Sequence, residues 1–259
     1  MICFNQEIHD RLNHASRLWI FLDYDGTLAH FAPTPDVVIP DQDLINLLSR
    51  LVHQPNIHLA VISGRQLRHI RTLLPIPGIW LAGSYGIELL TPDGKQIDRL
   101  VYSSIRPLME ALKPEWQQLI DGKHNFYLED KGWTLAIHAR YASDQEAASV
   151  LAAARQLADR YANPSGLRLL GGQKFLEICP VAADKGNTVR YLLDHDPFSA
   201  ALPVSIGDDD KDEKAFITVK ERGGIAILVA EKKRPTNADC LLASPEAVRA
   251  WLSSLILPE

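Results

Sequence analysis

Short apolar runs alternate with segments of helical periodicity along most of the chain. The runs that predict buried strands are Trp19–Leu22, His58–Ile62, Ile79–Ala82, Val204–Ile206 and Ile225–Val229. Between them, the segment 41–54 carries leucines on one helical face, and Ser244-Pro245 opens a last helix with an N-cap and a first-turn proline. Strands separated by helices predict an α/β fold with a doubly wound, mostly parallel, Rossmann-like sheet.

The middle of the chain has a different pattern. Two helical stretches, Pro107–Ile120 and Asp144–Tyr161, are accompanied by amphipathic strand candidates at Trp133–His138 and Phe175–Ile178. This mixture predicts an inserted α+β domain at 103–181 that packs over the mouth of the parallel sheet. The core domain would then consist of residues 1–102 and 182–259.

Composition narrows the class of protein. The chain has 259 residues, 46% hydrophobic and 23% charged, with a formal net charge of -5, which argues against a broad nucleic-acid-binding face. No apolar run approaches the roughly 20 residues that a membrane-spanning helix needs. The cysteines, Cys3, Cys179 and Cys240, are far apart and form no metal-type pair. We therefore expect a reduced, cytoplasmic protein with no nucleic-acid or membrane partner.

Two aspartates directly follow the first predicted strand. The run 19–22 leads into Asp23 and Asp25, and a Gly26-Thr27 turn comes next. Residues i and i+2 of an extended backbone point the same way, so both carboxylates could address one group at the carboxyl end of a parallel strand. Because carboxylates repel each other and a phosphate, a divalent cation is the natural third participant. Taken alone, the pattern also fits a plain turn.

A second acidic group follows the predicted strand 204–206. Residues 207–213 are Gly-Asp-Asp-Asp-Lys-Asp-Glu, and carboxylates are hard oxygen ligands that suit Mg²⁺. For this segment alone, an acidic solvated loop at a helix N-terminus is the simpler interpretation. That interpretation weakens because two strand ends with paired aspartates would converge on one crevice.

Two further polar groups complete the pattern. Ser63-Gly64-Arg65 follows the strand 58–62, and its hydroxyl and backbone N–H groups suit phosphate oxygens, although Ser63 could also cap a helix. Asp184-Lys185-Gly186 opens the helix before the strand 204–206, where Lys185 could neutralise a phosphate or a nucleophile. The four groups in this order indicate phosphoryl transfer more strongly than any one alone.

The motifs DYDGT, SGR, a lysine that opens a helix, and GDDDKDE resemble those of the haloacid dehalogenase superfamily of phosphotransferases. The insertion is similar to the superfamily's type-two cap. Within the superfamily, the chain most resembles the trehalose-6-phosphate phosphatases over nearly its whole length. Outside the core motifs, the resemblance rests on a Pro33–Asp36 turn, the segment Leu81–Glu88, and the cap segments Leu128–Arg140 and Gly172–Pro180.

This resemblance implies a phosphatase of trehalose biosynthesis that hydrolyses trehalose 6-phosphate with Mg²⁺. Asp23 would attack phosphorus and form an aspartyl-phosphate, while Asp25 would act as acid and then base. The implied catalytic residues are Asp23, Asp25 and Lys185, and the implied phosphate-binding residues are Ser63, Gly64 and Arg65. The implied metal ligands are Asp23, the Asp25 backbone carbonyl and Asp208, supported from nearby by Asp209 and Asp212.

In the cap, the resemblance assigns the sugar contacts to Glu129, Lys131, Arg140 and Glu177. The alternative for these charged residues is salt bridging between neighbouring strands. His138 is interpreted as a structural histidine.

Four positions depart from the trehalose-phosphatase pattern. Tyr85 replaces a usual histidine, Lys211 a threonine, Ala139 an aromatic residue and Gln173 a lysine. None belongs to the phosphoryl-transfer set, so the reaction type is unaffected and the identity of the substrate is open to alternatives.

The first alternative is another phosphorylated glycoside, such as a glucosylglycerol phosphate or a mannosyl- or glucosylphosphoglycerate. A non-catalytic sugar-phosphate-binding subunit is disfavoured, because Asp23, Asp25, Lys185 and Asp208 are all present. The expected partner is a small-molecule sugar phosphate, and we expect a monomer that works beside a separate synthase.

Overall fold

The chain separates into two compact units. The structure, a computed structural model, describes residues 6–31, 38–162, 166–172, 174–196, 198 and 200–257. The first unit comprises Met1–Ile97 and Asp184–Glu259, and the second comprises Asp98–Ala183. The sequence placed these boundaries at 102/103 and 181/182. The predicted Pro33–Asp36 turn, Gln173 and Cys3 lie outside the described residues.

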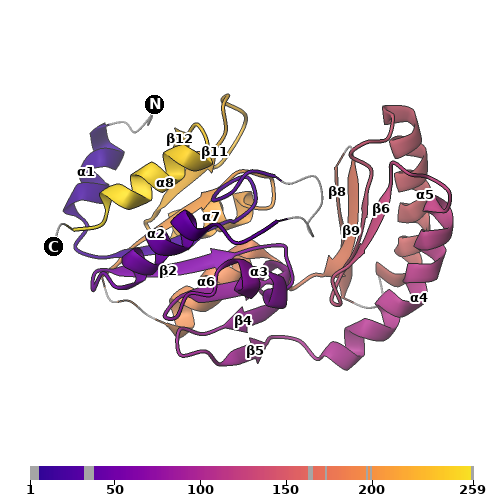
Figure 1. The fold of residues 1–259 in the computed structure, drawn as a ribbon, viewed down its shortest axis with the longest axis horizontal. Coiled ribbons are helices and arrows are strands. Elements are labelled where there is room, and N and C mark those ends of the chain that lie inside the picture. Colours follow the sequence, from indigo (N-terminus) through magenta and orange to yellow (C-terminus); the bar gives the residue numbers. More distant parts are fainter. Residues whose placement is uncertain are drawn as a thin grey trace. The chain divides into compact units, whose positions relative to one another are not determined.

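The first unit contains an eight-stranded sheet in the order β12-β11-β10-β1-β2-β3-β4-β5 (Figure 1). Neighbouring strands from β12 to β3 are parallel, and β4 is antiparallel to β3. The strands are β1 Leu18–Leu22, β2 Ile57–Ile62, β3 Trp80–Gly83, β4 Glu88–Leu90, β5 Gln96–Asp98, β10 Leu202–Gly207, β11 Ile225–Val229 and β12 Cys240–Leu242. The predicted α/β core is thus confirmed, with an antiparallel edge.

Strand β1 lies at the topological switch point of the sheet. The chain pairs β1 with β2 on one side and later returns to pair β10 on the other side. Since these strands are parallel, their carboxyl ends lie at one edge, where such sheets bind ligands. The segments after β1, β2 and β10 are therefore brought together by the topology.

Strand β1 is apolar throughout because both of its faces are covered. Leu18, Ile20 and Leu22 belong to one hydrophobic cluster, whereas Trp19 and Phe21 belong to a second. This alternation explains why the sequence shows a continuous apolar run instead of a polar alternation.

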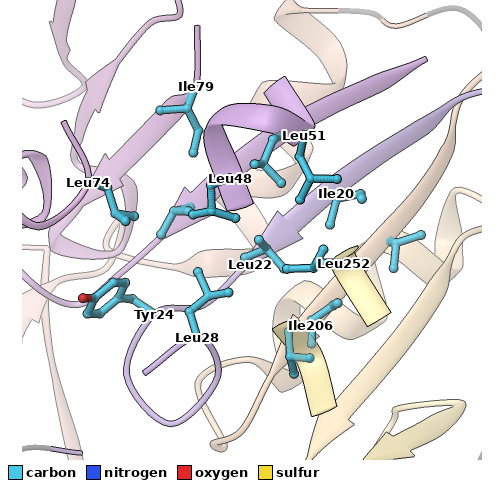
Figure 2. Packing of buried hydrophobic residues seen from close by; sticks show 14 of the residues in the cluster. Ile20, Leu22, Tyr24, Leu28, Leu48, Leu51, Leu74, Ile79, Ile206 and Leu252 are labelled. Carbon is cyan, nitrogen blue, oxygen red and sulfur yellow. The ribbon is translucent and has the colours of Figure 1, made fainter. Parts of the chain in front are cut away.

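Helices from distant parts of the sequence cover the first of these faces. Figure 2 shows Leu48 and Leu51 of α2 and Leu252 of α8 packed around Ile20 and Leu22. Helix α2 starts where the Asp41 carboxylate accepts hydrogen bonds from two backbone N–H groups and caps the helix. The helices whose residues join this cluster are α1 Gln6–His14, α2 Gln42–Val52, α3 Leu67–Leu73 and α8 Pro245–Ser254. The second face is covered by α6 Lys185–His195 and α7 Glu213–Glu221.

The second unit is an antiparallel sheet with two long helices. Its strands are β6 Tyr127–Asp130, β7 Leu135–His138, β8 Leu167–Gly172 and β9 Phe175–Pro180, in the order β6-β7-β9-β8. Helices α4 Tyr102–Ile120 and α5 Asp144–Ala162 pack on one face of this sheet (Figure 1). They are joined by a hydrogen bond from Trp116 Nε1 to the Ala154 carbonyl (3.0 Å). Among the described residues, no helix is both long and apolar enough to cross a membrane.

Two predicted boundaries in this unit were wrong. Helix α4 begins at Tyr102, so Pro107 lies inside it and not at its start. The last predicted strand before α5 begins at Leu135 instead of Trp133, because the chain turns at Gly132 with φ +76°.

Gly186 permits close packing between α6 and α7, and its replacement tests that packing. A Cβ at this position would lie 2.6 Å from the Lys214 carbonyl oxygen. Alanine favours a helix over glycine by about 1 kcal/mol, but overpacking costs about 1–3 kcal/mol. The difference between these two effects predicts that Gly186→Ala lowers the free energy of unfolding in urea by up to about 2 kcal/mol. The exposed Arg50→Ala in α2 should change it by less than about 0.5 kcal/mol. A more stable Gly186→Ala would contradict this account.

Candidate active site

The loop after β1 carries the first aspartates to the sheet edge. Asp23 is the first residue after β1, and its backbone N–H donates to the Ile206 carbonyl of β10 (2.9 Å). The loop turns at Gly26, whose φ is +83°. A Cβ at Gly26 would overlap the carboxylate of Asp208. Glycine is needed at this turn both for its backbone conformation and for the close approach of the two acidic loops.

Asp212 organises the acidic loop after β10. Its Oδ2 accepts hydrogen bonds from the backbone N–H groups of Asp208 (3.1 Å) and Asp209 (3.2 Å). Its Oδ1 accepts a hydrogen bond from Lys185 Nζ (2.6 Å). Since both oxygens are engaged by the protein, the geometry favours the supporting role predicted for Asp212 over direct metal ligation.

Lys185 joins the two acidic loops. It is the first residue of α6, after the N-cap Asp184, and its Nζ lies 2.6 Å from both Asp23 Oδ1 and Asp212 Oδ1. Burial alone would lower the pKa of Lys185, but the carboxylates of Asp212 and Asp23 outweigh burial and raise the pKa well above its usual value. Lys185 is therefore a permanent positive charge beside the predicted nucleophile.

One lysine does not balance the carboxylates around it. Burial, opposed by Lys185 but reinforced by Asp208 and Asp209, raises the pKa of Asp23 to about 7. Burial together with Asp209 and Asp212 raises the pKa of Asp208 to about 7. Such shifts mean that the site holds more negative charge than its protein environment stabilises.

This surplus of negative charge fits a divalent cation. One oxygen each of Asp23, Asp208 and Asp212 lies within 4.8 Å of the others. Asp208 Oδ1 is buried and has no hydrogen-bond partner among the residues that the structure describes, although buried polar atoms normally have one. Carboxylate oxygens are the ligands of hard cations. The cluster can therefore hold a divalent metal, with Asp208 as its clearest ligand.

The predicted phosphate-binding turn follows β2. Its Ser63 donates its backbone N–H to the Ala82 carbonyl (2.9 Å), and its hydroxyl oxygen accepts a hydrogen bond from the Arg65 N–H (3.1 Å). Helix α3 begins only at Leu67, so Ser63 lies in the turn before the helix and is not its N-cap. A Cβ at Gly64 would lie 2.8 Å from the Tyr85 ring, which explains the glycine.

Arg65 pairs with the predicted acid–base residue. Its Nε and Nη2 each lie 2.7 Å from one carboxylate oxygen of Asp25. Such a bidentate pair fixes the orientation of the carboxylate. The sequence predicted Arg65 as a phosphate ligand and did not foresee this pair; its role toward phosphate stays a prediction.

Three of the four predicted sugar contacts lie together in the second unit. The register of β6, β7 and β9 places Glu129 and Glu177 on either side of Ala136. Lys131 Nζ lies 2.9 Å from Glu177 Oε1 and 3.7 Å from Glu129 Oε2. Burial lowers the pKa of Lys131, but Glu177 and Glu129 outweigh it and raise that pKa. Arg140 lies exposed beyond the end of β7.

Two neighbours of this group were not predicted as partners. Thr134 Oγ1 donates to Glu177 Oε1 (2.7 Å), and Glu177 is fully buried. His138 Nε2 lies 2.9 Å from Glu129 Oε2, which agrees with its interpretation as a structural histidine. A cross-strand register in the sequence could have paired these residues, but the register depends on the turn at Gly132.

Comparison with known proteins identifies the family. A sequence model described as trehalose-phosphatase matches residues 21–246. The chain belongs to this family.

A curated relative agrees with the assignment to the trehalose-phosphatase family, and a solved structure agrees with the fold. The trehalose-phosphate phosphatase of Mycobacterium ulcerans is 32% identical over 243 residues, which are 91% of this chain and 60% of that protein. The chain thus spans about 60% of the length of such curated relatives. The C-terminal domain of trehalose-6-phosphate phosphatase from Candida albicans has a TM-score of 0.84 at 21% identity, with 96% of each chain covered.

A haloacid dehalogenase-like hydrolase from Bacteroides thetaiotaomicron has a TM-score of 0.63 at 15% identity. The comparison covers 92% of this chain and 99% of that one. The predicted haloacid dehalogenase fold, a core with an inserted cap, is thereby confirmed.

Two departures from the trehalose-phosphatase pattern are neighbours in space. Lys211 Nζ lies 5.8 Å from the centre of the Tyr85 ring, although 126 positions separate the two in sequence. Ala139 is fully buried and donates its N–H to the Lys174 carbonyl (2.8 Å). Tyr85 and Lys211 lie beside the predicted phosphate-binding turn, because the Tyr85 ring packs close to Gly64.

The acidic cluster predicts how metal binding responds to substitution. We expect Asp208→Ala to weaken binding of a divalent cation at least about tenfold, because its unpartnered oxygen is the clearest ligand. The matched control is Asp210→Ala, whose side chain is 94% exposed; it should change the affinity less than about twofold. Calorimetric titration with Mg²⁺ measures both. If Asp208→Ala and Asp210→Ala changed the Mg²⁺ affinity equally, Asp208 would not be a metal ligand.

The buried pair in the second unit predicts a large loss of stability. Lys131→Met leaves the fully buried Glu177 carboxylate without its cation, and such losses cost about 3–5 kcal/mol. Adding Glu177→Gln should restore part of this loss by removing the uncompensated charge. Urea unfolding followed by circular dichroism measures the change, with the exposed Lys123→Met as control. A cost of Lys131→Met no larger than the control's would contradict the prediction.

Proposed function

We propose that this chain is a Mg²⁺-dependent phosphatase that hydrolyses trehalose 6-phosphate to trehalose and phosphate through an aspartyl-phosphate intermediate. The observation that carries the proposal is Asp23 at the end of β1, with the Lys185 ammonium 2.6 Å from its carboxylate. The chain's family, and relatives named trehalose-phosphate phosphatase, support the choice of substrate.

In the first step, an oxygen of Asp23 attacks phosphorus opposite the sugar oxygen. The phosphorus–oxygen bond to the sugar breaks, and the sugar oxygen takes a proton from Asp25. Lys185 offsets charge on the nucleophile and on the phosphoryl oxygens, a task that requires fixed positive charge more than covalent chemistry. Ser63 and Gly64 bind the phosphoryl oxygens from the turn after β2.

In the second step, Asp25 takes a proton from water, which attacks phosphorus and releases phosphate and free Asp23. Both Asp25 oxygens accept hydrogen bonds from Arg65. This arrangement orients Asp25 as a base for the second step. The first step needs a proton on Asp25, so the Arg65 pair must open when substrate binds.

A divalent cation in the acidic cluster would offset the charge of the phosphoryl group and the surrounding carboxylates. Mg²⁺ suits a site of few carboxylates because it retains several waters. The residues proposed to hold it are Asp23, Asp208 and the backbone carbonyl of Asp25, with Asp209 and Asp212 in support.

The charged group in the second unit supports recognition of a polyol. Glu129 and Arg140 are partly or fully exposed and supply an acceptor and donors that match sugar hydroxyls. Lys131 and Glu177 are buried and paired with each other, so as proposed sugar contacts they would have to exchange that pairing for the sugar. We further propose a cytoplasmic monomer that receives its substrate from a separate synthase.

The nucleophile assignment is tested by Asp23→Asn. The amide is a poor nucleophile, so phosphate release from trehalose 6-phosphate should fall by at least about 10³-fold. Thermal unfolding should be little changed, because Lys185 retains its bond to Asp212. Turnover that survives this substitution in a folded protein would exclude Asp23 as the nucleophile.

The substrate is tested by measuring phosphate release from a panel of sugar phosphates side by side. Trehalose 6-phosphate should react far faster than glucose 6-phosphate. Tyr85 and Lys211 favour including glucosylglycerol phosphate and the mannosyl- and glucosylphosphoglycerates. A faster rate on one of these would keep the chemistry and replace the substrate.

A further inference from the structure

The turn after β3 contains two non-glycine residues with a left-handed backbone. Ser84 and Tyr85 have φ values of +50° and +58°, a left-handed conformation that costs a non-glycine residue of order 1–2 kcal/mol. Hydrogen bonds hold it in place: the Ser84 N–H donates to the Arg65 carbonyl (2.7 Å), and the Tyr85 N–H to the Ser63 carbonyl (2.9 Å). Strain of this kind persists where the surroundings over-determine it, often at functional sites.

The strained turn places the Tyr85 ring against the phosphate-binding turn. Tyr85 is only 4% exposed, and a Cβ at Gly64 would lie 2.8 Å from its Cε1, Cζ and Oη atoms. Thr188 Oγ1 of α6 donates to the Tyr85 carbonyl (2.9 Å). The ring thus packs against the turn after β2, while α6 holds the Tyr85 backbone.

Lys211 lies over the Tyr85 ring. Its Nζ is 5.8 Å from the ring centre and 3.3 Å from Asp209 Oδ2. An aromatic face within about 6 Å attracts a cation. Unlike the buried Lys185, the Lys211 side chain is 32% exposed, so its ammonium is held by two groups and is still accessible to a ligand.

The net charge of the acidic cluster suggests a role for Lys211. With a divalent cation bound and Lys185 protonated, the carboxylates of Asp23, Asp208, Asp209 and Asp212 leave a net negative charge. An incoming phosphate dianion would meet repulsion, which one more cation offsets.

We propose that Lys211, seated on the Tyr85 ring, is a second cation that binds the phosphate group of the substrate, with Tyr85 as its positioning residue. The inference rests on the proposed phosphatase function and names a further phosphate-binding residue of the same site. Its ligand class is the dianionic monoester of a small polyol and, equally, the inorganic phosphate product.

Calorimetric titration of the full chain with inorganic phosphate at constant Mg²⁺ tests the inference without turnover. Lys211→Gln should raise the phosphate Kd about tenfold, the effect of losing one charge-assisted hydrogen bond. Lys211→Arg retains the charge and should stay within about threefold. Lys95→Gln is the matched control. Lys95 is exposed and lies in the turn after β4. The Pro92 carbonyl of this turn accepts a hydrogen bond from Gly78, which precedes β3, so the turn lies at the edge of the sheet opposite the acidic cluster. This substitution should change Kd less than about twofold.

The affinity for Mg²⁺ distinguishes ligand binding from a structural role. Removing a positive charge near the carboxylates should leave Mg²⁺ binding unchanged or tighter in Lys211→Gln, while phosphate binding weakens. Tyr85→Phe retains the ring and should match the unmodified chain. Tyr85→Leu, checked for folding by thermal unfolding, should raise the phosphate Kd about threefold, with little further effect in the Lys211→Gln background.

Three results would overturn the inference: no binding of phosphate to the unmodified chain, equal effects of Lys211→Gln and Lys95→Gln, or weaker binding of both Mg²⁺ and phosphate in Lys211→Gln. A chain that binds phosphate through Lys211 but hydrolyses no sugar phosphate supports the inference and contradicts the proposed function instead.

Discussion

The buried ammonium of Lys185, shared by Asp23 and Asp212, is the interaction on which the site depends. Burying an unpaired lysine costs several kcal/mol, so the end of β1, the start of α6 and the loop after β10 are stable only when placed together. The N-cap Asp184 and the glycine at 186 bring α6 into that position. One charge thereby fixes three segments that are far apart in sequence.

The same arrangement leaves the folded protein with an electrostatic penalty. Burial and neighbouring carboxylates raise the pKa of Asp23 and Asp208 to about 7, whereas burying a neutral side chain would carry no such cost. The proposed role of these carboxylates, which is to hold a divalent cation and to act on a phosphoryl group, accounts for this electrostatic cost. Stability is thus lower than this fold could reach, a frequent consequence of a functional site.

The sequence predicted the core of the site because parallel strands end at one edge of a sheet. Asp23, Ser63 and Asp208 each follow an apolar run, so the fold class alone brings them together. Side-chain pairings such as Arg65 with Asp25 were not predictable, since they depend on the conformation of two turns. Cross-strand partners such as Thr134 were missed for a similar reason: the register follows from a turn at Gly132 that no apolar pattern marks.

The acidic loop after β10 is held by hydrogen bonds from its backbone N–H groups. These bonds do not depend on which residue stands at position 211. The Asp212 carboxylate accepts hydrogen bonds from the backbone N–H groups of Asp208 and Asp209. Asp209 Oδ1 accepts one from the backbone N–H of Lys211 (2.8 Å). None of these three hydrogen bonds uses the side chain at 211, so the loop backbone does not depend on it; the Lys211 ammonium adds an ion pair to Asp209 Oδ2 (3.3 Å). Lys185, by contrast, acts through its buried side chain and cannot be exchanged. The structure thus distinguishes the buried Lys185, which we propose acts in phosphoryl transfer, from the partly exposed Lys211, which we propose adjusts the affinity for the anion.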